Sequence, residues 1–86
     1  MKFVSNDDSS MGNGHRLGVI EFAGNEGSSS IQVGARIQAV CDAAWEEETE
    51  NGGRLEFFTT DGAATQSKVL ALDSDKVATF GGGITF

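Results

Sequence analysis

Two segments near the middle of the chain alternate between apolar and polar side chains, which is the pattern of a half-buried β-strand. They read GARIQAV at residues 34–40 and RLEFFTT at residues 54–60. In the first strand, expected over residues 31–40, the small residues Ala35, Ala39 and Cys41 share one face with Ile37. In the second, Phe57 and Phe58 point to opposite faces, which predicts burial on both sides.

Short strands are also expected in several flanking segments bounded by turn-forming residues. These segments are residues 2–5, 16–23, 67–72 and 77–80, with a further strand beginning at Ile84. Asn13 and Gly14 form the strongest two-residue hairpin signal, so residues 2–5 are expected to pair with residues 16–23. The last strand lacks a partner in the sequence, which indicates either a fragment or a module that continues elsewhere.

Residues 42–51, DAAWEEETEN, separate the two central strands. Asp42 could cap a helix, and the following Asn51-Gly52 pair could end it. The segment has no apolar stripe beyond Trp45, and isolated helices of this length are marginal. We therefore expect a wide acidic loop with at most one helical turn.

Length and composition restrict the chain to one domain that has difficulty stabilising itself. With 86 residues, a monomer buries roughly 60–65% of its unfolded surface. The single cysteine, Cys41, cannot form a disulfide within the chain. Metal ligands are not indicated, so self-association is the favoured source of additional stability.

The net charge of −7 argues against binding to nucleic acid or to an anionic membrane, since both require a basic surface. No apolar run is long enough to span a membrane, and the first ten residues do not resemble a secretory signal peptide. The sequence is therefore compatible with a cytoplasmic protein, with export by another route, or with a particle assembled in the cytoplasm. Twelve glycines and no proline favour an all-β chain of short strands.

Enzymatic chemistry is not indicated. A glycosidase requires two carboxylates in one pocket, one of them with a raised pKa. The acidic residues lie in polar turns, where a solvated carboxylate is expected: Asp7, Asp8, Glu46, Glu47, Glu48, Glu50, Asp61 and Asp73. Cys41 and His15 could form a nucleophile and base, but no third group to orient them is evident, and a free cysteine is usually a small core residue.

The signals for a metal site and for a glycan site are weak. No stretch matches a calcium-binding loop, and His15 is the only histidine, so a metal on a symmetry axis would rest on that residue alone. We expect no cofactor and no metal. Trp45 is the only tryptophan and flanks the acidic loop, so it could stack on a sugar. The favoured alternative is that Trp45 anchors its loop onto a neighbouring chain.

The strand segments occur in a familiar order of short phrases. The phrases resemble "LG-x-I-x-F", "ARI-x-A", "RLEF-x-T", "x-L-x-L/I-D-S" and "ATF-x-G-x-I". They are carried by Leu17, Gly18, Ile20 and Phe22; Ala35, Arg36, Ile37 and Ala39; Arg54, Leu55, Glu56, Phe57 and Thr59; Leu70, Leu72, Asp73 and Ser74; and Ala78, Thr79, Phe80, Gly81 and Ile84. Together they resemble a β-rich module common in bacteriophage tail fibres and tail spikes, often found upstream of an intramolecular-chaperone domain.

The resemblance implies an intertwined homotrimeric stem of short antiparallel strands and hairpins. Residues 1–86 would be a single fibre module, or a fragment of a longer fibre, located on the virion and assembled in the bacterial host cytoplasm. Its partners would be two further copies of the chain and other tail proteins. Its function would be structural support for host attachment, and the alternative is a small carbohydrate-binding head that uses residues 42–53 and Trp45 against a host-surface glycan. The residues expected to pack in the trimer or core are Ile20, Phe22, Ile37, Leu55, Phe57, Phe58, Leu70, Leu72 and Phe80.

Two features depart from the family pattern. The family hairpin turn often reads Ser-Gly-Asn, where this chain has Asp75, Lys76 and Val77. The loop over residues 42–51 is also unusually acidic. Since binding specificity is commonly carried by loops, the acidic loop is where an individual property of this chain is expected.

Overall fold

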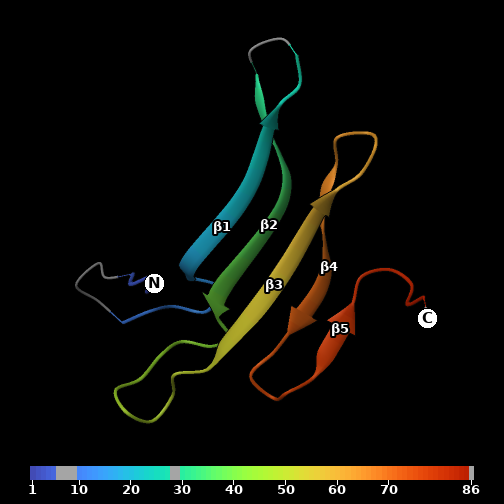
Figure 1. Ribbon diagram of the computed structural model, residues 1–86. Coiled ribbons are helices and arrows are strands. Elements are labelled where there is room, and N and C mark those ends of the chain that lie inside the picture. Colours follow the sequence, from blue (N-terminus) through green and yellow to red (C-terminus); the bar gives the residue numbers. More distant parts are fainter. Residues whose placement is uncertain (6–9, 28–29, 86) are drawn as a thin grey trace.

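The protein is a single antiparallel sheet, described here from a computed structural model covering residues 1–5, 10–27 and 30–85 (Figure 1). The sheet contains β1 (Arg16–Asn25), β2 (Ile31–Cys41), β3 (Gly53–Thr60), β4 (Gln66–Leu72) and β5 (Ala78–Phe80). Each strand pairs with its neighbours in the sequence, in the order β1-β2-β3-β4-β5. The expected all-β class is confirmed, and the described part contains no helix, so none that could cross a membrane.

The strands form where side-chain alternation was strongest, and their register lines up the alternating positions. Ile37 of β2 lies opposite Phe57 of β3, and Gln38 lies opposite Glu56. Because residues directly opposite in an antiparallel pair share a face, this register places apolar residues on one side and polar residues on the other. A bulge between Phe57 and Phe58 shifts the pairing with β4 without exchanging the two faces.

The β3–β4 and β4–β5 connections are two copies of the same turn, opened by Asp61 and by Asp73. Asp61 Oδ1 accepts hydrogen bonds from the backbone of Ala63 (2.8 Å) and Thr65 (3.0 Å). Asp73 Oδ1 accepts equivalent bonds from Asp75 (2.9 Å) and Val77 (3.0 Å).

Each turn also contains a residue with positive φ, Ala64 at 66° and Lys76 at 67°. This is the left-handed region that ordinarily favours glycine. The two turn predictions are therefore confirmed, and each aspartate acts as a local backbone cap.

Three expectations from the sequence are wrong or fall outside the described residues. Residues 2–5 form no strand, and the Asn13-Gly14 turn does not join them to β1; instead Gly14 N donates to Cys41 O at the end of β2 (2.8 Å). Ile84 begins no strand over residues 84–85, and Phe86 lies outside the described part. Asp7 and Asp8 also lie outside it, as do the other residues of 6–9 and residues 28–29.

The acidic connection is a loop, as expected, and contains no helix. Glu46 and Glu50 form an isolated antiparallel bridge, closed by Glu46 N to Glu50 O at 2.9 Å and Glu50 N to Glu46 O at 3.2 Å. Glu48, at the tip, has a φ of 57°. The absence of an apolar stripe beyond Trp45 leaves a helix in this segment without packing support, so the chain forms a tight reversal instead.

The molecule is one layer thick and exposes far more surface than a compact domain. Its extents are 47 × 35 × 21 Å, and its radius of gyration is 15.3 Å, compared with about 12 Å for a compact domain of this length. Its accessible surface is 6266 Å², about 1,400 Å² above the roughly 4,900 Å² expected for a compact 9.0 kDa monomer. Among the described residues, the buried apolar side chains are Met11, Val40 and Cys41.

Candidate functional site: the two faces of the sheet

One face of the sheet, called here the apolar face, carries two cross-strand rows of apolar residues. The first row crosses all five strands, from Ile20 through Ile37, Phe57 and Leu70 to Phe80. The second row is Gly18, Ala39, Leu55, Leu72 and Ala78. Phe22, opposite Ala35, extends this face toward the end of β1. Eight of the nine residues expected to pack are thus brought together, and Phe58 lies on the other side.

None of these packing residues is buried in the single chain. Ile20 and Leu55 are each 37% exposed, and Leu72 is 39% exposed. Phe80 and Phe22 are exposed to 46% and 55%. Soluble monomers rarely leave a contiguous apolar patch of this extent in water. The apolar face therefore has the composition of a core but lacks a covering layer within the described chain.

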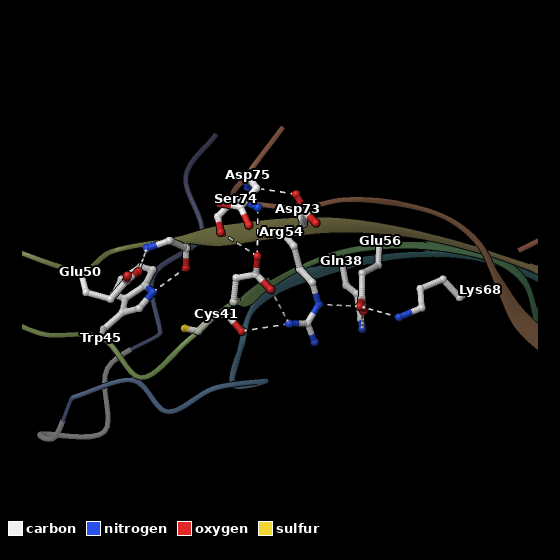
Figure 2. A network of polar contacts seen from close by, with 12 residues as sticks. Gln38, Cys41, Trp45, Glu50, Arg54, Glu56, Lys68, Asp73, Ser74 and Asp75 are labelled. Atoms are coloured by element: carbon white, nitrogen blue, oxygen red, sulfur yellow. Dashed lines mark hydrogen bonds and ion pairs between the residues drawn. The ribbon is translucent and has the colours of Figure 1, made fainter. Parts of the chain in front are cut away.

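The opposite face, called here the polar face, holds a chain of alternating charges that links four segments (Figure 2). Glu56 of β3 accepts hydrogen bonds from Gln38 Nε2 (2.8 Å), Arg54 Nε (2.8 Å) and Lys68 Nζ (2.9 Å). Arg54 also donates from its Nη1 to Asp42 Oδ1 at 3.0 Å. These contacts connect β2, β3 and β4 through side chains as well as through the backbone.

The network continues from Asp42 to the β4–β5 turn. Asp42 Oδ2 accepts hydrogen bonds from the Ser74 backbone N (2.9 Å) and from Ser74 Oγ (2.8 Å). These bonds, led by the backbone N–H of Ser74, lower the pKa of the Asp42 carboxyl. The twin turn at Asp73 is thereby attached to the start of the acidic loop, which explains why an aspartate follows β2 directly.

Glu56 is the central group of the polar face, and its side chain is only 5% exposed. Burial acts against its charged form, but hydrogen bonds from Arg54, Gln38 and Lys68 outweigh burial and lower the pKa of Glu56 to about 2. Such a carboxylate stays ionised across the physiological range. A general acid in glycoside hydrolysis would require a shift in the opposite direction.

Arg36 and Phe58 complete this face beside Glu56. The Arg36 guanidinium carbon lies 3.9 Å from the centroid of the Phe58 ring, a cation–π contact. The Arg36 side chain thus covers part of the Phe58 ring on the polar face. Two buried polar atoms, Arg36 Nε and Gln38 Oε1, lack a hydrogen-bond partner within the described part of the chain, so the face is not fully satisfied.

Trp45 anchors the acidic loop onto its own chain. Its backbone N donates to Met11 O (2.8 Å), and its indole Nε1 donates to Gly52 O (2.7 Å). The ring is half-buried, so it does not stand out as a free platform for a sugar. The loop carboxylates Glu46, Glu47 and Glu48 are exposed, as expected for a solvated acidic turn.

His15 and Cys41 are neighbours through the backbone, with Cys41 N donating to His15 O at 2.8 Å. The His15 ring does not serve the thiol: its Nε2 lies 3.0 Å from Ser5 Oγ. Burial raises the pKa of the Cys41 thiol, which is fully buried, so the residue behaves as a core side chain. In residues 1–5, 10–27 and 30–85, His, Cys, Asp and Glu side chains form no group of three or more placed to hold a metal ion.

Sequence reasoning did not find the network around Glu56 or the contact between Ser5 and His15. Arg54 and Glu56, two positions apart on a strand, were a usable signal because such residues share a face. The other partners, Gln38 and Lys68, come from different strands and depend on the register. No protein-family model and no curated protein matches the sequence of this chain.

Proposed function

We propose that this chain is a structural module of a bacteriophage tail fibre, in which three copies associate through their apolar faces into a stem that supports host attachment. The proposal combines the ordered phrases that resemble the fibre module with one structural observation. That observation is the uncovered row from Ile20 to Phe80, which crosses every strand of the sheet.

The energetics favour association of this kind. Moving an apolar side chain of this size from water into an interface contributes about 1.5–3 kcal/mol when burial is complete. The surface excess of about 1,400 Å² per chain exceeds the roughly 800 Å² that each partner contributes to a standard interface. Covering the apolar face with further copies would supply the second layer that a single sheet lacks.

The remaining parts of the proposal follow from the fibre resemblance. The module would be located on the virion after assembly in the bacterial host cytoplasm, with other tail proteins as neighbours. The alternative carbohydrate-binding head is not favoured, because the Trp45 indole N–H is already bonded to Gly52 and its ring is half-buried.

The decisive experiment measures the mass of the protein in solution by sedimentation equilibrium over micromolar concentrations. The expected species has three times the mass of the chain. A folded monomer that persists at tens of micromolar would overturn the proposal. A stable dimer would be compatible with association through the apolar face but would contradict the proposed trimer.

Matched variants locate the interface. Leu72→Glu places a charge on the apolar face, and we expect it to weaken association at least about tenfold. Val77→Glu removes a comparably exposed apolar residue (51%) from the β4–β5 turn and should leave association unchanged. Equal effects of the two substitutions would mean that the apolar face is not the interface.

Location on the virion requires a separate test. An antiserum raised against the chain should label the tail fibres of phage particles released by a host that carries the gene. Particles that contain no detectable copy of the chain would contradict the fibre assignment even if the chain is trimeric.

A further inference from the structure

The N-terminal segment lies across one end of the apolar face without pairing to the sheet. In Figure 1 this end of the chain lies beside the start of β1. Phe3 contacts Gly18, the first residue of the second apolar row: a Cβ at Gly18 would lie 2.8 Å from the Phe3 Cβ. Gly18 does not have a positive φ, so glycine is required here for space and not for backbone conformation.

Phe3 covers this end of the face incompletely. A hollow of about 340 Å³ remains between Phe3 and the sheet, lined among others by Leu17, Ile20, Ile37 and Leu55. Its lining is predominantly apolar, and Phe3 itself stays 52% exposed. A hollow of this size could accept a large apolar side chain, so the fit of Phe3 is loose compared with a protein core.

The attachments of the segment are also few. Residues 1–5 form no strand, and within the described part of the chain one side-chain hydrogen bond, between Ser5 Oγ and His15 Nε2 (3.0 Å), ties them to the sheet beside the Phe3 contact. Val4 is 72% exposed. Segments with few buried contacts and few hydrogen bonds open at low free-energy cost.

We propose that the hollow beside Gly18 is a docking position for an apolar side chain of a second copy of this chain, and that Phe3 partly covers it in the single chain. Residues 1–5 therefore compete with self-association. The occupant is a second copy because the hollow is continuous with the rows of the apolar face, which carry the interface under the proposed function. The identity of the occupant rests on the proposed function. The position of Phe3 against Gly18 is observed in the structure and is independent of that function.

Competition predicts a gain of affinity when the cover is removed. A protein whose binding-competent form is only a fraction of the population binds more weakly by that fraction. If the hollow is uncovered in about a tenth to a third of single chains, Phe3→Ser strengthens self-association about 3- to 10-fold. Gly18→Ala acts in the same direction, because its methyl group displaces Phe3 while the strand backbone tolerates alanine.

The test compares Phe3→Ser and Gly18→Ala with Val4→Ser, a matched loss of an exposed apolar residue from the same segment. Association constants are measured by sedimentation equilibrium. In parallel, binding of the apolar dye anilinonaphthalene sulfonate is measured at dilutions where each protein is a single chain. We expect the first two variants, and not the third, to associate more tightly and to bind more dye.

The two measurements separate failure of this inference from failure of the proposed function. Weaker association of Phe3→Ser would make Phe3 part of the interface and overturn the competition. Unchanged association together with unchanged dye binding would show that Phe3 does not cover the hollow. Increased dye binding in a chain that never associates would retain the cover but overturn both the second copy as its occupant and the proposed function.

Discussion

The two faces of this sheet reverse the usual relation between polarity and burial. On the polar face, Glu56 is 3% exposed and Gln38 is 8% exposed. On the apolar face, which is the other side of the same sheet, Leu55 and Leu72 remain more than a third exposed. The single chain thus buries the Glu56 carboxylate and the Gln38 amide, and leaves the large apolar side chains of the opposite face in contact with water.

This difference indicates a division of roles. The polar face connects β2, β3, β4 and the β4–β5 turn within one chain, through contacts of 2.8–3.0 Å. The apolar face makes no equivalent contact to a second layer of the described chain, and under the proposed function its contribution depends on a partner. The polar face is therefore expected to govern the integrity of the sheet, and the apolar face is expected to govern assembly.

The largest expected effect is from Glu56→Ala. It leaves Arg54 and Lys68 without their shared carboxylate. Because Arg54 and Lys68 are 25% and 46% exposed, the expected cost is about 3 kcal/mol, at the lower end of the range for a buried ion pair. Urea unfolding at fixed protein concentration, followed by Trp45 fluorescence, measures the loss. Glu21→Ala, which removes an exposed carboxylate from the same face, should change stability by less than about 0.5 kcal/mol. Similar costs for both substitutions would show that the network does not hold the sheet.

Lowering the pH is expected to reduce the folding stability of the chain through the polar face. The pKa of Glu56 is lowered from 4.5 to about 2 on folding, so its stabilising contribution is complete above pH 4.5 and is lost as the pH falls toward 2. The lost stability is on the order of 3 kcal/mol. Unfolding free energies measured between pH 7 and pH 2 should show this loss, and Glu56→Gln should flatten the profile in that window. An equally steep profile in the variant would assign the acid sensitivity to other carboxylates.

A polar substitution on the apolar face should separate assembly from folding. Because Leu72 is already 39% exposed, Leu72→Ser should lower the stability of the dilute single chain by only about 1 kcal/mol. Its effect should grow with protein concentration as the wild type associates and the variant does not. Unfolding curves recorded at two concentrations, a hundredfold apart, would show the divergence. Parallel curves for variant and wild type would contradict the division of roles.

The smallest effect is expected at a turn position where a substitution changes mainly the backbone strain. Lys76 adopts a φ of 67°, which glycine adopts without strain, so Lys76→Gly should raise stability by about 0.5–1 kcal/mol. Ala64→Gly, at the equivalent position of the twin turn, should act in the same direction. Both gains should appear in urea unfolding with no change in the association constant. A loss of stability would mean that the Lys76 side chain contributes more than its backbone strain costs.

Local pattern predicted the strands well, because alternation and the aspartate turns are encoded within a few residues. It failed at residues 2–5, where a β-prone composition carries no information about a partner, and Phe3 packs on Gly18 instead of pairing. The exposed fractions of the apolar rows also could not be predicted from the sequence pattern. Alternation identifies which residues share a face, but whether that face is covered depends on a second layer, which the described part of the chain does not supply.

The meander also has a kinetic consequence. Every strand pairs only with its neighbours in the sequence, so the loops closed during folding are short. Hairpins of this kind form in about 1–10 μs, and the sheet can extend from whichever hairpin forms first. Encounter between copies depends on concentration and is much slower at micromolar levels. Under the proposed function, the ordered sheet would therefore form before the copies assemble, and the supply of folded chains, rather than their folding, would limit the rate of assembly.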